Sequence, residues 1–306
     1  MRNYISANEF SFNGFVILVL ATILAGIVLG LLLGFVGQFF FLVGIFPALI
    51  GIAGGYVLAW VIKKFKMPNK AVAILIGTLM AVMIYGVYTY FDYIQTQNYL
   101  YEALMFSDDS IPIIFEDMDK ASLMTTFLYD TTGSTGFIGF WKFTADAGIN
   151  IVPGGMGSGF SLNPFWSTLY LISEFFIIVC FAVQGAWEQV NRSFCSSCGD
   201  WYDKGEQLAL FEMEDENKVI NAIEHDRYDE LKEIMPIEVS KLPCLILKAH
   251  SCLKCHNETP LLELSRLTVG DKGLHKYKRR FRGLITSSQL SELEDKLESK
   301  LNREPA

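Results

Sequence analysis

The sequence predicts a membrane protein: an α-helical four-span transmembrane bundle, joined to an outer, mostly helical segment and a small cytoplasmic α+β domain. Two observations predict this class. Charged side chains make up 19 of the first 190 residues but 39 of the last 116, so the first part suits lipid and the second suits water. Four apolar stretches are also long enough to cross a hydrocarbon core of about 30 Å, which takes roughly 20 residues.

The four predicted spans carry no charge in their interiors, apart from one glutamate in the last of them. The second span ends against Lys63 and Lys64. The first is too long for a signal peptide and lacks a small-residue cleavage site, so we expect it to stay in the mature protein. The expected ranges are 15–36, 39–62, 71–91 and 167–187.

Charges that flank the spans predict their orientation. The turn at 63–70 carries four lysines and no acid, whereas the segment 92–166 carries nine acids against Lys120 and Lys142. Because Lys and Arg are enriched in cytoplasmic loops, we expect the basic turn inside and the acidic segment outside. An even number of spans then places both termini in the cytoplasm. We predict a multi-pass protein of a bacterial inner (plasma) membrane.

Small residues recur at every fourth position of the first span, at Gly26, Gly30 and Gly34. These positions share one helix face, where another backbone can approach closely. We interpret this face as helix packing within the bundle. The alternative is self-association of the chain into a homo-oligomer.

Glu174 is the one acidic residue well inside a predicted span, about 12 Å from its start at 1.5 Å per residue. A charged carboxylate is costly at that depth, so Glu174 is either protonated or faces a partner or water. Two interpretations stay open. One is a neutral, hydrogen-bonded glutamate that holds helices together, and the other is a functional carboxylate on a pathway for a proton, cation or substrate.

The acidic segment 92–166 is too long for a plain loop, so we expect it to fold. Helical spacing predicts helices over 93–106 and 119–129, followed by a turn at 131–136. The glycine-rich stretch 151–160 lacks the GK[ST] ending of a phosphate-binding loop, and we predict a flexible connection there.

Two CxxC pairs occur in the charged part of the chain, Cys195 with Cys198 and Cys252 with Cys255. Cysteines at i and i+3 fit a tight turn whose thiolates converge on one metal, and two such pairs complete a tetrahedral shell of four sulfurs. A cytoplasmic location keeps thiols reduced, which favours a metal over a disulfide. The sequence therefore predicts one structural Zn²⁺ ion bound by these four cysteines.

Strand-like sequence follows each pair, at 207–213 and at 260–269, and a further candidate strand lies at 242–248. In this arrangement residues 193–269 resemble a zinc ribbon, and the resemblance covers no other part of the chain. The spacing departs from that family, because 53 residues separate Cys198 from Cys252, against 15–20 in a simple ribbon. We interpret the excess as a helical insertion at 214–236.

Alternatives for the cysteines stay open. The first pair, followed by Gly199, Trp201 and Tyr202, is similar to a rubredoxin-like iron site. A CxxC pair is also the motif of thiol–disulfide chemistry. His250 and His256 are alternative ligands in place of a cysteine. Iron or a cycling disulfide would make the chain a membrane redox protein.

A basic run with interleaved aromatic residues lies at the end of the domain expected at 188–285. Lys/Arg clusters near a cytoplasmic leaflet attract anionic lipids by about 1 kcal/mol per charge, so we interpret the run as a contact with lipid or a partner. The net charge of −8 argues against nucleic acid. Leucines at steps of three and four then predict an amphipathic helix within 286–306. The basic residues are Lys272, Lys276, Lys278, Arg279, Arg280 and Arg282.

Together these features favour binding and assembly over catalysis. We expect a sensor, scaffold or complex subunit that has no catalytic activity of its own and recruits a protein partner on the cytoplasmic side. One alternative is a subunit of an ion or proton channel or transporter that uses Glu174. The other is the membrane redox protein named above.

Overall fold

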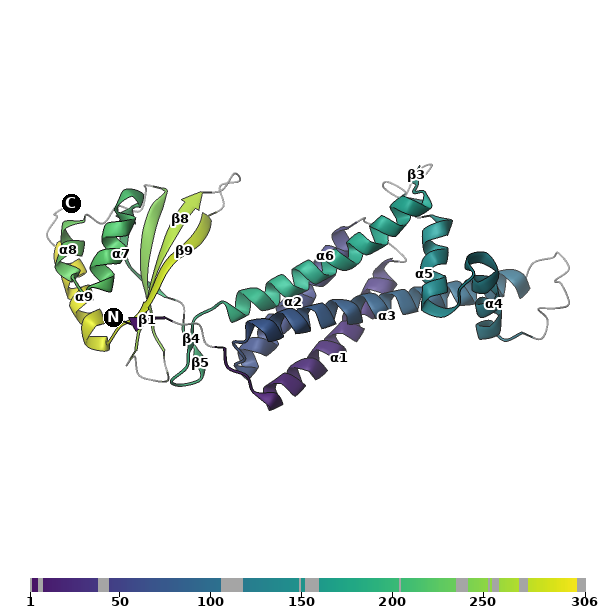
Figure 1. The fold of residues 1–306 in the computed structure, drawn as a ribbon, viewed down its shortest axis with the longest axis horizontal. Coiled ribbons are helices and arrows are strands. Elements are labelled where there is room, and N and C mark those ends of the chain that lie inside the picture. Colours follow the sequence, from purple (N-terminus) through teal and green to yellow (C-terminus); the bar gives the residue numbers. More distant parts are fainter. Residues whose placement is uncertain are drawn as a thin grey trace. The chain divides into compact units, whose positions relative to one another are not determined.

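The computed structural model divides the chain into two compact units, a helical unit at residues 9–191 and a sheet unit at residues 1–8 and 192–306 (Figure 1). The first residues of the chain therefore belong to the same unit as its last third. The structure describes residues 2–4, 8–37, 44–105, 118–148, 150–151, 160–203, 205–234, 242–252, 254, 259–269 and 275–301.

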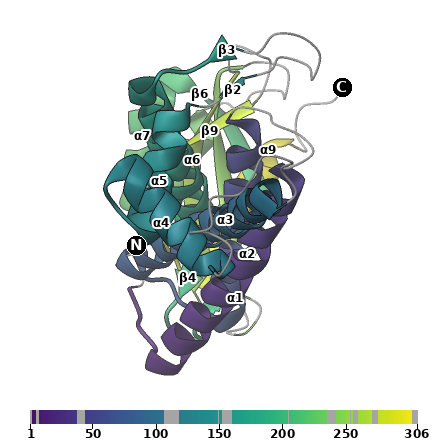
Figure 2. The same cartoon turned by 90° about the vertical axis from the view of Figure 1, so that its right-hand side faces the viewer.

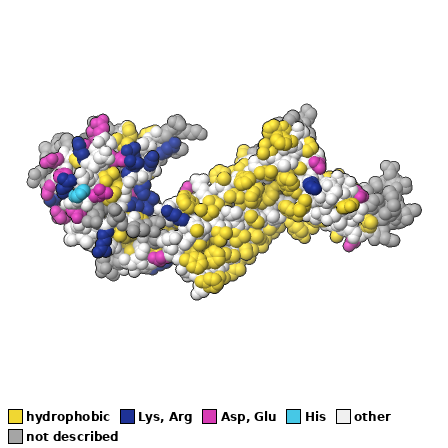
Figure 3. Space-filling view, viewed as in Figure 1, with side chains coloured by type: hydrophobic (Ala, Val, Ile, Leu, Met, Phe, Trp, Pro, Cys, Tyr) yellow, Lys and Arg dark blue, Asp and Glu magenta, His cyan; other side chains and the backbone are white. Residues whose placement is uncertain are grey.

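Four long helices form most of the helical unit, and each is long and apolar enough to cross a membrane. They cover the four apolar stretches expected from the sequence. Large hydrophobic side chains form an extended outer surface on these helices (Figure 3). The helices are α1 (Phe12–Gly37), α2 (Ile45–Phe65), α3 (Lys70–Met105) and α6 (Pro164–Val190).

The bounds of α2 and α3 differ from the expected spans. α2 begins at Ile45 rather than at residue 39, and residues 38–43 lie outside the described part of the chain. α3 has 36 residues, so it is about 54 Å long, and it takes in most of the stretch 93–106 that the pattern assigns to a separate helix. α3 continues past the expected end of its span because no glycine or proline, which would end the helix, occurs between Gly86 and the end of α3.

Close backbone contact joins α2 to α6. A Cβ atom built on Gly185 would lie 2.6 Å from the Cα atom of Gly55, and one on Gly55 would lie 2.7 Å from the carbonyl oxygen of Phe181. No side chain fits at either glycine unless one backbone moves. These two glycines therefore set the distance between the two helices.

We expect Gly185→Ala to force α2 and α6 apart and to destabilise the helical unit by about 1–3 kcal/mol, the usual cost of overpacking. Gly86→Ala is the matched control, because a Cβ there meets nothing within 4 Å. Thermal unfolding of the detergent-purified chain measures both variants. Equal midpoints for the two would show that the contact between α2 and α6 is looser than described.

The small-residue face of α1 lies against α3. Cβ atoms built on its glycines would lie 2.5 Å from the Met83 Cβ atom at Gly26, 2.7 Å from the Ile84 carbonyl oxygen at Gly30, and 2.6 Å from the Phe91 ring at Gly34. α3 therefore covers this face within one chain.

One end of the helical unit is basic. The Lys64 Nζ atom, at the end of α2, lies 4.9 Å from the ring centroid of Trp60. The Lys70 Nζ atom, at the start of α3, lies 5.8 Å from the ring centroid of Trp187 near the end of α6. The turn at 63–70 and the last turns of α6 therefore meet at the same end of the bundle.

Two shorter helices, α4 (Lys120–Thr132) and α5 (Gly136–Ala147), lie at the other end (Figures 1 and 2). α4 is capped by Asp119, whose carboxylate accepts a 2.8 Å hydrogen bond from the Ser122 amide, and it stops at Gly133, where φ is +68°. The sequence pattern predicts α4 and the turn after it but not α5. β2 (Asn150–Ile151) pairs with β3 (Phe160–Ser161); most of the glycine-rich stretch between them is outside the described residues.

The sheet unit is built on a five-stranded antiparallel sheet, with the strand order β1–β9–β8–β7–β6. β1 is a two-residue strand from the start of the chain and pairs with the end of β9, an edge contact that no sequence pattern predicts. The strands are β1 (Arg2–Asn3), β6 (Glu206–Glu212), β7 (Cys244–His250), β8 (Leu261–Val269) and β9 (His275–Leu284).

Three helices pack on one face of this sheet: α7 (Glu216–Glu224), α8 (Tyr228–Glu233) and α9 (Ser287–Leu301) (Figure 1). Alternate strand residues point to the helices, so one hydrophobic core contains strand residues such as Leu247 and Leu264 together with helix residues such as Leu293. β6, β7 and β8 lie where strands are expected, α7 and α8 lie within the 214–236 insertion, and α9 is the expected C-terminal helix.

Candidate metal centre

The first CxxC pair lies in a short hairpin. β4 (Phe194–Cys195) pairs antiparallel with β5 (Asp200–Trp201), and Cys198 lies in the turn between them. Gly199 has a φ of +59°, a left-handed conformation that glycine adopts without strain. The ring of Phe194 packs edge-on against Trp201 at 5.0 Å between centroids, which supports the turn from behind.

The second pair begins where β7 ends, and its first cysteine joins the hairpin. The Sγ atom of Cys198 lies 3.1 Å from that of Cys195 and 3.1 Å from that of Cys252. All three sulfur atoms lie within 4.8 Å of one another. Cys195 and Cys252 are almost fully buried, whereas Cys198 is partly exposed. A metal ion bound between these sulfur atoms would thus be largely shielded from water.

A backbone hydrogen bond ties the two cysteine segments together, because the Asp203 amide donates at 3.0 Å to the Ser251 carbonyl. Within the first segment, the Tyr202 amide donates at 3.0 Å to the Ser193 carbonyl. An ion pair adds to this contact, because the Lys254 Nζ atom lies 2.7 Å from an oxygen of Asp200. The three thiols are therefore held in place by the fold and do not depend on the metal alone for their proximity.

The remaining predicted ligands are not part of the described cluster. Cys255 and His256 lie outside the described residues. His250 lies nearby, but its Nδ1 atom is 3.0 Å from the carbonyl oxygen of Asp203 and must donate to it, while its Nε2 atom is buried without a hydrogen-bond partner among the described residues. A Cβ atom on Gly205 would lie 2.6 Å from the His250 ring, so that glycine makes room for the imidazole.

The other two cysteines are separate from the cluster. Cys244 is buried at the start of β7, and this burial raises the pKa of its thiol. A buried thiol with a raised pKa is a poor nucleophile and a poor ligand. Cys180 is exposed on α6 in the helical unit.

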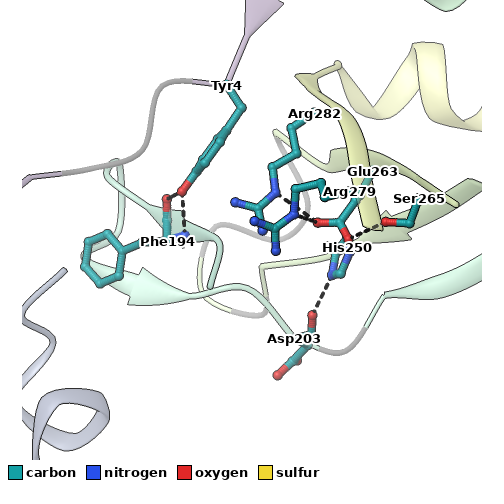
Figure 4. A network of polar contacts seen from close by, with 8 residues as sticks. All are labelled: Tyr4, Phe194, Asp203, His250, Glu263, Ser265, Arg279 and Arg282. Atoms are coloured by element: carbon teal, nitrogen blue, oxygen red, sulfur yellow. Dashed lines mark hydrogen bonds and ion pairs between the residues drawn. The ribbon is translucent and has the colours of Figure 1, made fainter. Parts of the chain in front are cut away.

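A polar network connects the hairpin to the sheet (Figure 4). The Tyr4 hydroxyl accepts a 2.8 Å hydrogen bond from the Phe194 amide and donates at 3.2 Å to the Phe194 carbonyl. The Arg282 guanidinium lies 5.4 Å from the centroid of the Tyr4 ring and donates at 2.9 Å to Glu263. Phe194, the residue before Cys195, is thus held by Tyr4, which directly follows β1, and the sequence does not reveal this contact.

We expect Tyr4→Phe to loosen the hairpin locally. The change leaves the amide and carbonyl of Phe194 without these two hydrogen bonds, which costs about 1–3 kcal/mol for buried polar groups. Amide hydrogen exchange at Phe194 and Cys195 should accelerate by about tenfold or more, since 1.4 kcal/mol corresponds to a factor of ten. Tyr277→Phe, at an exposed ring, is the control. Unchanged exchange in Tyr4→Phe would show that the clamp contributes nothing.

The basic run forms β9, and ion pairs neutralise much of its charge. Arg279 and Arg282 both donate to Glu263, at 3.0 and 2.9 Å, and Arg280 donates at 2.6 Å to Glu216. Lys276 and Lys278 are exposed, and Lys272 lies outside the described residues. The run is therefore less positive than its sequence implies.

Glu174 lies on α6 and is buried, with 6% of its surface exposed. The Tyr170 hydroxyl, one turn earlier on the same helix, donates a short hydrogen bond to its carboxylate. The hydroxyl groups of Thr22, Thr78 and Ser173 donate to carbonyls of their own helices and not to Glu174.

The cluster of three thiols is a donor set for a soft or borderline metal ion. Thiolate sulfur binds Zn²⁺, Cu⁺ and iron better than it binds Mg²⁺ or Ca²⁺. The positions of the three sulfur atoms therefore fit a bound metal ion. They do not distinguish between Zn²⁺, Cu⁺ and iron. Comparison of the chain with protein-family models, with curated proteins and with solved structures finds no match in any of the three.

Proposed function

We propose that this chain is an integral membrane sensor, scaffold or complex subunit, whose cytoplasmic sheet unit carries one structural zinc ion. In this proposal it has no catalytic activity of its own. The observation that carries the proposal is the convergence of Cys195, Cys198 and Cys252, from segments more than fifty residues apart, on one buried point.

The surface of the helical unit supports the membrane assignment. Large apolar side chains project outward along α1, where Leu20, Leu24 and Val28 are each more than half exposed. Soluble monomers rarely expose apolar patches of this extent, whereas lipid requires them. The unit therefore suits a bilayer better than water.

The orientation is supported by two features. The basic turn at 63–70 and the end of α6 meet at one end of the bundle, and the sheet unit follows α6 directly. β1 also belongs to the sheet unit, so residues before α1 and residues after α6 share one side of the membrane. Four crossings satisfy this requirement, and the positive-inside rule supports our proposal that this side is the cytoplasm, in a bacterial inner membrane.

We propose that the cluster is a structural zinc site that resembles the site of a zinc ribbon. Cys255 is the fourth ligand in this proposal. Closed all-thiolate shells are usually structural, and two of the three described sulfur atoms are almost fully buried. A redox role would need access to a partner electron carrier, which this burial disfavours.

The partner surface that we propose lies where β8 ends and β9 begins. In the described part of the sheet unit, two large hydrophobic side chains are more than half exposed, Val269 and Tyr277. Lys276 and Lys278 are the neighbours of Tyr277 in the sequence. The Lys248 Nζ atom lies 5.0 Å from the Tyr277 ring centroid. An aromatic ring beside a lysine, on a strand that carries two further lysines, suits a protein partner that presents acidic and apolar side chains.

A photo-crosslinking amino acid placed at Tyr277 in living cells tests this function. We expect a discrete protein adduct from position 277, its loss when Cys252→Ser is added, and none from Tyr129, an exposed position on α4. Adducts with lipid alone, or a protein adduct that persists with Cys252→Ser, would contradict the proposed metal-dependent recruitment.

A further inference from the structure

A cavity of about 130 Å³ lies inside the helical unit, near the end that carries α4 and α5. This volume is far more than one water molecule needs and less than the roughly 300 Å³ at which pockets for drug-sized ligands begin. Its walls come from α3, α5 and α6. The lining residues that carry the argument are Asp92, Glu174, Tyr88, Tyr170, Phe140 and Trp141.

Glu174 reaches this cavity with part of its hydrogen-bonding capacity unused. Its side chain is more than nine-tenths buried, and Tyr170 is the one residue of the described chain that hydrogen-bonds to its carboxylate. An ionised carboxylate has about four acceptor positions. No other donor among the described residues reaches the remaining positions, and Glu174 lines the cavity.

The cavity has no positive charge of its own. Two carboxylates line it, Glu174 from α6 and Asp92 from α3, and none of the described lining residues is a lysine, arginine or histidine. The lysines of the helical unit that pair with tryptophans lie at the opposite end of the bundle. Buried negative charge needs compensation, which either a proton on these carboxyl groups or a cation from outside the protein supplies.

The remaining lining residues favour an organic cation over a metal ion. Mg²⁺ and Ca²⁺ require six or more oxygen ligands in a close shell. Here five of the ten lining residues are aromatic, and the Tyr85 hydroxyl is already used at 3.3 Å on the Leu171 carbonyl. Aromatic rings attract ammonium groups through their negative faces, and aromatic walls are the usual means of holding quaternary ammonium ligands.

We propose that this cavity binds a small organic ammonium ion, with its charged nitrogen beside Glu174 and Asp92 and its alkyl groups against the aromatic walls. This ligand is separate from the metal-centred function, because it binds in the helical unit. It also gives the two carboxylates, which lie 82 residues apart in the sequence, a common purpose.

Isothermal titration of the chain in nanodiscs with choline, and with its neutral isostere 3,3-dimethylbutan-1-ol, tests the proposal. We expect choline to bind at one site per chain and the uncharged isostere to bind at least tenfold more weakly. Equal affinity for the two, or no binding of choline, would overturn the proposal, as would Ca²⁺ binding at this site in its place.

Variants then assign the binding to this cavity. Glu174→Gln should weaken choline binding at least tenfold, whereas Glu188→Gln, on the same helix but exposed and paired with Gln184, should leave it unchanged. Thermal unfolding checks that each variant is folded, and Asp92→Asn gives the same test from α3 if Glu174→Gln does not fold. Choline affinity that is unchanged in the folded cavity variants would contradict the assignment.

Discussion

Replacing Cys252 with serine is expected to unfold the cysteine segments of the sheet unit and to leave the four long helices in the membrane. Cys252 is buried and joins the β4–β5 hairpin to the end of β7, so its loss breaks up the cluster of three thiols. Binding of structural zinc contributes about 10–16 kcal/mol to the folding free energy of zinc-finger peptides at neutral pH. The loss of one ligand removes much of this binding free energy. Limited proteolysis should cut the variant within residues 192–306 at protease concentrations that spare the wild type.

Cys180→Ser is the matched control, because that thiol is exposed on α6 and does not belong to the cluster. It should behave as the wild type in proteolysis and in membrane extraction. A Cys252→Ser chain whose sheet unit stays protease-resistant, or a wild type that stays resistant after treatment with a chelator, would contradict a structural metal.

The second large effect is expected from Glu216→Ala, which removes the carboxylate between Arg266 and Arg280. Glu216 is almost fully buried and accepts hydrogen bonds from both guanidiniums, one from β8 and one from β9. The change leaves two charges without their partner. Because each arginine is about one-third exposed, water can solvate the two unpaired guanidinium groups and offset part of the lost interaction. We expect the sheet unit to lose about 2–3 kcal/mol of stability.

Amide hydrogen exchange of β8 and β9 measures this cost in the full-length chain. Asp215→Ala is the neighbouring control, since its ion pair with Lys218 is exposed on the lysine side and should contribute below about 1 kcal/mol. Similar protection in the two variants would show that the buried ion pair adds little to the sheet unit.

The same carboxylate gives the sheet unit a predictable acid sensitivity. Burial alone would raise the pKa of Glu216, but Arg266 and Arg280 hold it below the ordinary value of 4.5. Because the folded pKa is the lower one, this stabilisation is fully present above pH 4.5 and is lost as the pH falls through the folded value. Glu263, held by Arg279 and Arg282, acts in the same direction, so Glu216→Ala removes only part of the acid sensitivity.

The sequence predicts the four long helices because each is an uninterrupted apolar run, and it predicts the cysteine cluster because a CxxC spacing is local. It does not predict β9, since a run of lysines and arginines resembles a solvated segment. Only the fold brings Glu216 and Glu263 beside those arginines. It also does not predict β1, because two residues carry no periodic pattern.

The link between Asp92 and Glu174 is also beyond sequence analysis. The charge pattern places Asp92 in the acidic outer segment and Glu174 inside a span. α3 continues past the expected end of its span, so Asp92 stays on a helix that packs against α6. The length of a helix beyond its apolar part is set by the absence of a terminating residue, which is a weak signal beside hydropathy.

The metal content of the detergent-purified chain, read beside a count of its free thiols, tests the central claim most directly. We predict about one zinc per chain, with Cys195, Cys198, Cys252 and Cys255 protected from alkylation until the metal is removed. Iron in place of zinc, or a metal-free protein with a reducible disulfide among these cysteines, would contradict it and make electron transfer the function to pursue.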